Sequence, residues 1–183
     1  MGLHGLTKGT EFESLAKEAA RAEINGTLMY YSLARLATEQ GYDDVAKILI
    51  ESGNQEAVHA GFYTNLNGKY PKDFWAFLES VKKLEIEGEG RVKAFADKFR
   101  AAGFAGIANE METFAKEERH HGIVIDEILQ KYKPDSKQVD TAGKKIYVCP
   151  CCGYEYVGDI NSESNDWTCP VCSQPKKDFT LKE

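Results

Sequence analysis

The sequence predicts a mainly α protein in which four long helices form a bundle and a small metal-binding domain follows. Apolar side chains recur at helical spacing in four stretches of residues 10–132, with short breaks between them. All five cysteines lie between positions 149 and 172, beyond these stretches. The segment between them is polar and has no hydrophobic periodicity. We therefore expect a bundle at 1–132, a linker at 133–146 and a cysteine-containing domain at 147–183.

The bounds of the four helices follow from capping and breaking residues. Thr10 and Glu13 have the form of a capping box for the first helix, and Asp73 can cap the third. Gly41 and Gly103 can close the first and third helices, and Asn67-Gly68 breaks the second. Pro134 stops the fourth. The expected helices cover residues 10–39, 43–66, 74–101 and 105–132.

Composition excludes several classes of protein. The chain is 42% hydrophobic and 28% charged, as in a globular protein, and its net charge of -6 disfavours a nucleic-acid partner. No run of 18 apolar residues is present, so we expect no membrane partner. The start MGLHGLTKGT lacks the pattern of a secretory signal, so we expect a cytoplasmic protein.

Two Glu-x-x-His patterns are the main functional signal in the bundle. Glu56/His59 and Glu118/His121 each place a carboxylate and an imidazole on one helix face. They are 62 residues apart, which is also the separation of Glu23 and Glu85. A repeated helical hairpin accounts for both separations.

The six repeated residues are the ligand set of a di-iron or di-manganese carboxylate site in a helical bundle: one Glu from each of two helices and Glu-x-x-His from each of the other two. A single Glu-x-x-His is weak evidence because such pairs are common on solvated helix faces. The repetition of the pair is stronger evidence for a metal site, because six unpaired polar groups in a core without metal would be costly. Glu117/His120 has the same spacing one residue earlier, but the repeat selects Glu118/His121, so we expect Glu117 and His120 to face outward.

The cysteines predict a second metal site. Two CxxC pairs supply four thiolates for tetrahedral iron or zinc, and their spacing alone does not separate the two metals. Cys151 lies between ligands and is expected to be an unligated thiol. The expected ligands are Cys149, Cys152, Cys169 and Cys172.

The cysteine domain resembles rubredoxin, with Gly-Tyr after the first pair, Trp-x-Cys-Pro at the second, and Lys176/Phe179 as Lys-x-x-Phe. This similarity favours iron over zinc. A carboxylate bundle followed by such a domain resembles rubrerythrin over essentially the whole chain, which implies a ferritin-like bundle with a di-iron centre. The resemblance implies that Glu56 and Glu118 bridge the metals, Glu23 and Glu85 are terminal carboxylates, and His59 and His121 are the imidazole ligands.

The resemblance also implies that Tyr30 forms a hydrogen bond at the site. The chain departs from the family pattern on the third helix, where a further carboxylate is expected three residues after Glu85 and Gly88 stands instead. A seventh ligand is then Glu87 or Glu89, or it is missing.

By this resemblance the protein is a di-iron peroxidase that reduces hydrogen peroxide to water. Electrons pass through the rubredoxin-type iron from an NAD(P)H-linked reductase or a rubredoxin, and a homodimer with exchanged tails is expected. The alternatives are a ferroxidase or iron-handling protein, which uses the same six ligands, and a zinc-ribbon binding module. The attached electron-delivery domain argues against the first, and the repeated ligand set against the second.

Overall fold

A computed structural model of the chain describes residues 2–134, 144–151, 153–171 and 174–182. Their contacts group the chain into two compact units, Met1–Lys72 and Asp73–Glu183. Each unit contains one helical hairpin, and the second also contains the small cysteine domain. Much of the expected linker, residues 135–143, lies outside the described part, as do Cys152 and Cys172.

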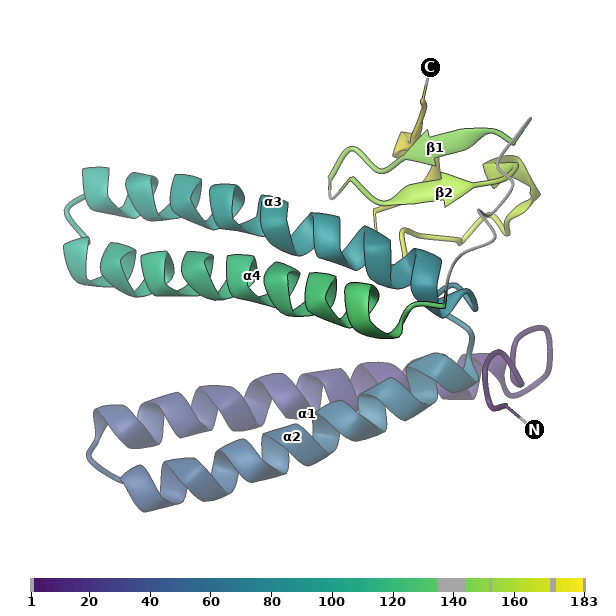
Figure 1. Cartoon of the computed structure of the whole chain (residues 1–183). Coiled ribbons are helices and arrows are strands. Elements are labelled where there is room, and N and C mark those ends of the chain that lie inside the picture. The colour runs from purple at the N-terminus through teal and green to yellow at the C-terminus, as the bar shows by residue number, and fades with distance from the viewer. Residues whose placement is uncertain (1, 135–143, 152, 172–173, 183) are drawn as a thin grey trace. The chain divides into compact units, whose positions relative to one another are not determined.

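The first unit is built on the hairpin of α1 (Glu13–Glu39) and α2 (Asp43–Leu66), whose helices lie side by side (Figure 1). Gly41 takes a φ of 80° in the turn, a conformation that glycine adopts without steric cost. The Tyr42 N–H donates to the Ala37 carbonyl at 2.8 Å and closes the end of α1. The expected second helix and its bounds are confirmed.

The expected start of the first helix is wrong by three residues, because α1 begins at Glu13 and not at Thr10. The two residues of the predicted capping box are used differently. The Thr10 hydroxyl accepts from the N–H of Phe12, two residues on, and the Glu13 carboxylate accepts from the N–H of Gly9 at 2.6 Å. Thr10 therefore closes a turn that precedes the helix.

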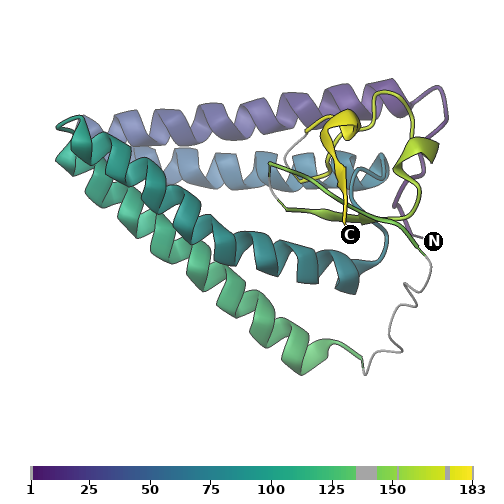
Figure 2. The ribbon, with the colours of Figure 1, turned by 90° about the horizontal axis from the view of Figure 1, so that it is seen from above.

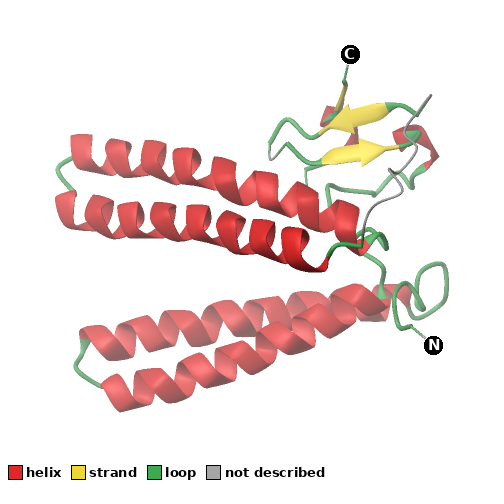
Figure 3. Ribbon diagram, in the orientation of Figure 1, coloured by secondary structure: helices red, strands yellow, loops and turns green. Residues whose placement is uncertain are grey.

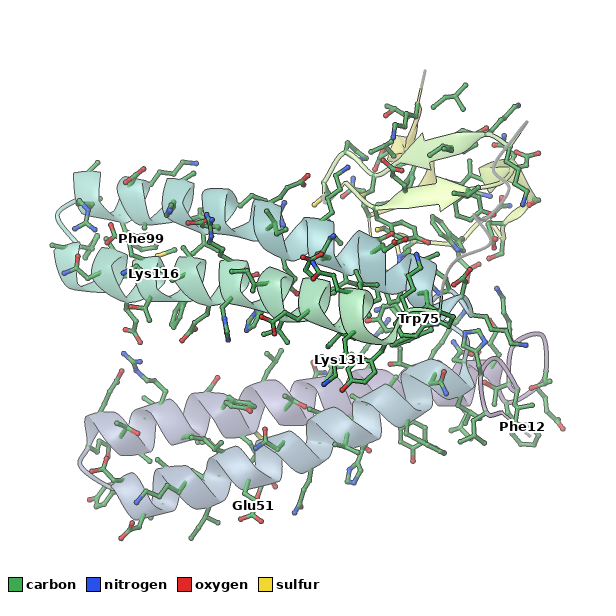
Figure 4. All side chains as sticks on the ribbon, viewed as in Figure 1. Phe12, Glu51, Trp75, Phe99, Lys116 and Lys131 are labelled. Atoms are coloured by element: carbon green, nitrogen blue, oxygen red, sulfur yellow. The ribbon has the colours of Figure 1, made fainter. Side chains whose placement is uncertain are left out.

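The second unit repeats this design with α3 (Phe74–Ala101) and α4 (Ala105–Tyr132), as expected from the sequence. Gly103 has a φ of 88°, and Phe104 N–H donates to the Phe99 carbonyl at 2.9 Å, matching the Gly41 turn bond for bond. Figure 2 shows α3 and α4 from above, close together at their turn and farther apart toward their other ends, and Figure 4 labels Phe99 at the turn end and Trp75 at the other end of α3.

Small residues form the seam between the helices of each hairpin. Ala34 and Ala46 are buried between α1 and α2, and their counterparts 62 residues on, Ala96 and Ala108, are fully buried between α3 and α4. Small side chains let two helices approach closely. The repeat therefore preserves the seam as well as the polar residues.

Asp73 caps α3, as the sequence predicts, and its side chain accepts from the Ala76 N–H at 3.1 Å. We expect Asp73→Ala to lower the free energy of unfolding by about 1 kcal/mol, because one N–H at the start of the helix loses its acceptor. Urea denaturation measures this loss. Asp73→Asn keeps an acceptor at the cap, so an equal loss in Asp73→Asn would contradict the capping role.

The cysteine domain, which we define as the described residues from 144 to 182, contains a small antiparallel sheet in the order β2-β1-β3. Its strands are β1 (Ile146–Val148), β2 (Glu155–Val157) and β3 (Thr180–Leu181), and two short 3₁₀ helices, η1 (Ile160–Ser162) and η2 (Lys176–Asp178), lie in its loops (Figure 3). Trp167 contacts Tyr156 and Phe179 edge-on, each at 5.4 Å between ring centroids. The domain thus has its own aromatic core.

The expected fold class is confirmed: the chain is mainly α, with four long helices of the ferritin-like kind and a small C-terminal domain that carries cysteines. Among the described residues, no helix has the length and apolar character needed to cross a bilayer.

Candidate metal centre

The first hairpin brings Glu23, Glu56 and His59 together. Their ligand atoms all lie within 4.8 Å of one another. The His59 Nδ1 is 3.5 Å from Glu23 Oε2 and 3.6 Å from Glu56 Oε2. Glu23 comes from α1 and the other two from successive turns of α2, so packing of the two helices creates the group.

The second hairpin brings Glu85, Glu118 and His121 together in the same way, again within 4.8 Å. His121 Nδ1 lies 3.3 Å from Glu85 Oε2. Both carboxylates of each group are half-buried and both imidazoles are exposed. The six residues selected by the 62-residue repeat therefore form two equivalent groups, one on each hairpin.

The carboxylates in each group are close enough to perturb one another. A hydrogen bond with Glu56 raises the pKa of Glu23, partial burial and the charge of Glu56 raise it further, and His59 opposes the rise. Burial, followed by a hydrogen bond with Glu85, raises the pKa of Glu118. Each pair thus favours holding a proton, and a bound cation would take the place of that proton.

Glycines give the carboxylates of α2 and α4 their room. A Cβ built on Gly88 would lie 2.8 Å from Glu118 Oε2, and one built on Gly26 would lie 3.3 Å from the Glu56 carboxyl carbon. Gly26 and Gly88 are counterparts in the repeat. A larger residue at either position would have to displace a predicted bridging carboxylate.

The alternative register and the predicted tyrosine lie outside both groups. Glu117 and His120 are exposed on α4, as expected from the repeat. Tyr30 is half-buried on α1, and a Cβ at Gly53 of α2 would lie 3.4 Å from the Tyr30 Cβ. Its hydrogen bond to a metal centre stays a prediction.

Glu87 and Glu89 do not join the second group either. Glu89 pairs with Lys93 and, at 3.2 Å, with Arg119, and the hydrogen bonds from these cations lower its pKa. Glu87 Oε2 lies 3.7 Å from Arg91 Nη1. Both carboxylates already face cations, and the position three residues after Glu85 is Gly88.

We therefore expect Glu89→Gln to leave the amount of bound metal unchanged, because its carboxylate serves Lys93 and Arg119. Glu85→Gln, four residues earlier on the same helix, is expected to lower it. Metal analysis of both purified variants measures the difference. Equal losses in the two variants would make Glu89 a ligand after all.

The cysteine domain holds Cys149 and Cys169 in matching loops. The Cys149 N–H donates to the Tyr154 carbonyl at 2.9 Å, and the Cys169 N–H donates to the Gln174 carbonyl at 2.7 Å, five residues on in both cases. Both side chains are buried, whereas Cys151 is exposed. The first loop turns at Gly153, whose φ is 77°. Cys152 and Cys172 lie outside the described residues, so the tetrathiolate stays a prediction.

Arg91 is a neighbour of the second group that the sequence analysis missed. Its Nη2 donates to the Leu84 carbonyl at 2.9 Å, and its charge counteracts the raised pKa of Glu118. Its counterpart in the repeat is Met29. Comparing the two halves of the repeat position by position would have revealed this difference.

The chain contains a duplicated helical hairpin with a Glu/Glu/His group on each copy, followed by a domain that carries cysteines. These features define a ferritin-like protein with carboxylate–histidine groups suited to metal.

Comparison with known proteins narrows this class. Residues 76–151 match the family model described as Rubrerythrin. A putative rubrerythrin of Methanocaldococcus jannaschii is 28% identical, with 98% of this chain and 92% of the relative covered. Nigerythrin of Nitratidesulfovibrio vulgaris is 24% identical, with 94% and 86% covered. A solved structure of nigerythrin in a mixed-valence state matches at 22% identity and a TM-score of 0.33, covering 100% of this chain and 94% of that one.

These comparisons support a rubrerythrin-type protein. This type indicates an iron-binding oxidoreductase connected with oxidative stress, and the two Glu/Glu/His groups offer ligands for a di-iron site.

Proposed function

We propose that the protein is a non-haem di-iron peroxidase that reduces hydrogen peroxide to water. Electrons come from an NAD(P)H-linked reductase or a rubredoxin and pass through an iron in the cysteine domain. The observation that carries the proposal is the pair of equivalent Glu/Glu/His groups, each within 4.8 Å, on a chain that also holds a cysteine domain.

The residues present fit two iron ions. Each group offers two carboxylates and one imidazole, a mixture of hard oxygen and softer nitrogen ligands suited to iron. In each group a neighbouring carboxylate helps to raise the pKa of one glutamate, Glu23 in the first and Glu118 in the second, and such a site favours a cation. When bound, the two ferrous ions supply one electron each, which with two protons converts one peroxide molecule into two water molecules.

The side chains of each hairpin have distinct roles in this proposal. His59 and His121 would hold one ion each, with Glu23 and Glu85 as terminal carboxylates. Glu56 and Glu118 would be the carboxylates that the two ions share, and Gly26 and Gly88 leave room beside them. In the metal-free chain the Glu23–Glu56 pair favours holding a proton, and metal binding releases it.

The remaining parts of the proposal rest on the rubrerythrin type. Cys149, Cys152, Cys169 and Cys172 hold one iron, supported by the matching loops around Cys149 and Cys169. Tyr30 donates a hydrogen bond near the first group. The protein acts in the cytoplasm as a homodimer, and the bundle, linker and cysteine domain comprise residues 1–132, 133–146 and 147–183.

One preparation tests the metal assignment and the activity in sequence. The protein purified in air is expected to be red from the cysteine-bound iron and to bleach on reduction. With a reductase partner it is expected to consume NADH and peroxide faster than NADH and O2. A Cys169→Ser chain is the control, because it keeps both bundle groups and is expected to lose the colour and the NADH-linked turnover.

Two results would overturn the proposal. A colourless protein that contains only zinc would exclude the electron relay. Turnover with O2 that equals or exceeds turnover with peroxide would exclude a peroxidase.

A further inference from the structure

The two Glu/Glu/His groups have the same ligand types but differ in the side chains around them. Every second residue of α3 is charged from position 85 to position 93. The equivalent stretch of α1, residues 23–31, contains one charged residue, Glu23 itself. On the facing helix, Arg119 stands where the first hairpin has Ala57. The repeat therefore keeps the ligands and changes the charge next to them.

The Arg91 side chain lies along α3 beside a predicted ligand. Its Nη2 donates to the Leu84 carbonyl at 2.9 Å. In an α-helix this carbonyl faces the N–H of the residue four positions on, which is Gly88. Gly88 has no side chain, and a Cβ there would lie 2.8 Å from Glu118 Oε2. The guanidinium of Arg91 and the carboxylate of Glu118 therefore both lie beside Gly88.

The charge of Arg91 acts on Glu118 and is only partly offset by nearby carboxylates. Burial raises the pKa of Glu118, and Arg91 acts against this rise. Glu87 Oε2 lies 3.7 Å from Arg91 Nη1, which is beyond hydrogen-bonding distance. Glu89 pairs with two other cations and so already faces more positive than negative charge. A divalent cation at the second group would therefore be repelled by Arg91.

The first hairpin has the equivalent glycine without the charge. A Cβ built on Gly26 would lie 3.3 Å from the Glu56 carboxyl carbon. The position equivalent to Arg91 is Met29, which is uncharged and exposed. The predicted shared carboxylate of each hairpin thus lies against a glycine. The second hairpin has a guanidinium beside that glycine, and the first has a thioether at the same position of the repeat.

We propose that the two groups are unequal metal sites: the first hairpin takes up a divalent cation before the second, and Arg91 sets the difference. This inference rests on the proposed metal centre and adds the order in which its two positions fill. Repulsion between a unit charge and a divalent ion near a protein surface is expected to lower the affinity for the ion roughly three- to thirtyfold. At limiting metal the chain would hold one ion, bound by Glu23, Glu56 and His59.

Zinc titration of the full chain, followed by NMR of its ¹³C-labelled histidines, tests the order of filling. Zn²⁺ is suitable because it accepts carboxylate and imidazole ligands, does not change its oxidation state and leaves the ring signals sharp. The cysteine domain is filled with Zn²⁺ first, and the free zinc concentration is then raised with a zinc buffer. The chain has four histidines, and single His→Gln variants assign their signals.

The His59 signal is expected to shift at a roughly three- to thirtyfold lower free zinc concentration than the His121 signal. His4 and His120 lie outside both groups and are expected to keep their positions throughout. Equal midpoints for His59 and His121, or an earlier midpoint for His121, would overturn the inference alone. If neither signal moved, the metal centre itself would be refuted, and the inference with it. Neither result depends on iron or on peroxide turnover.

Exchange of the two differing side chains tests Arg91 itself. Arg91→Met is expected to bring the His121 midpoint to that of His59, and Met29→Arg to move the His59 midpoint toward that of His121. Arg91→Lys keeps a cation and is expected to retain most of the difference. Arg100→Met is the matched control, because it removes the same charge near the far end of α3, more than a Debye length away. An unchanged His121 midpoint in Arg91→Met would overturn the role of Arg91.

Salt separates an effect of charge from an effect of packing. Arg91 also binds the Leu84 carbonyl, so its removal changes a contact of α3 as well as a charge. A difference caused by charge is expected to shrink between about 0.01 M and 1 M salt, because the Debye length falls from about 30 Å to about 3 Å. If the His59 and His121 midpoints stayed equally far apart at the higher salt, packing would be the cause and the electrostatic proposal would be wrong.

Discussion

His121→Ala is expected to lose the metal of the bundle while keeping the metal of the cysteine domain. Three of the described side chains form the second group, so removal of the imidazole leaves two carboxylates that already share a hydrogen bond. Substitutions of residues that support a metal ligand lower metal affinity roughly 10–100-fold. The affinity for the bundle metal is expected to fall by more than this in His121→Ala, because His121 is itself a predicted ligand. Metal analysis after dialysis against a weak chelator measures it, and the visible colour reports the cysteine-bound iron separately.

His120→Ala is the matched control for this prediction. His120 is exposed, neighbours His121 in the chain and lies outside the group. The control is expected to retain the full metal content. If His120→Ala lost the bundle metal and His121→Ala kept it, the register taken from the 62-residue repeat would be wrong.

Gly122→Val is expected to lower the free energy of unfolding by about 1–3 kcal/mol, the usual cost of overpacking. A Cβ at this buried position would fall 2.6 Å from Ile86 Cγ1, 3.3 Å from the Ile86 backbone nitrogen and 3.4 Å from the Lys82 carbonyl oxygen. The helices α3 and α4 can accept it only by separating. Because Gly122 follows His121 and Ile86 follows Glu85, metal binding is expected to weaken as well. Urea denaturation with and without iron measures both effects.

Gly90→Ala provides the opposite result on the facing helix. Gly90 is exposed in α3, and a Cβ there has no neighbour within 4 Å. This substitution is expected to stabilise the protein by about 0.5–1 kcal/mol, because alanine favours the helix. A Gly122→Val chain as stable as the unaltered chain would show that the seam tolerates a wider spacing.

The sequence was sufficient to predict three helices with their ends, because each is bounded by a residue with one dominant local effect. Gly41 and Gly103 take the positive φ that ends a helix, and Asp73 supplies a cap acceptor. The start of α1 was misplaced because Thr10 and Glu13 satisfy backbone groups in the preceding turn. The spacing of Thr10 and Glu13 fits both a capping box and the turn that precedes the helix, so the spacing alone does not fix where the helix begins.

The candidate groups were predictable for a different reason. The 62-residue repeat fixed which glutamates and histidines correspond, and the helical period placed each pair on one face. Contacts between distant segments have no such period. Nothing in the spacing of Lys83 and Glu155 indicates that they form an ion pair, because α3 could contact the cysteine domain at any exposed turn. Nor does the spacing of Arg91 and Glu118 indicate that the charge of one affects the pKa of the other.

The 62-residue repeat contains both the seam of small residues and the Glu/Glu/His group, which suggests how a metal centre with six ligands can originate. Either hairpin alone carries one glutamate, one Glu-x-x-His pair and the alanines that let its helices approach. In evolutionary terms, a chain half as long needs only a copy of itself to supply six ligands. Duplication and fusion would then free one half to change, and Arg91 in place of Met29 is the kind of divergence that only a fused chain can keep on one side.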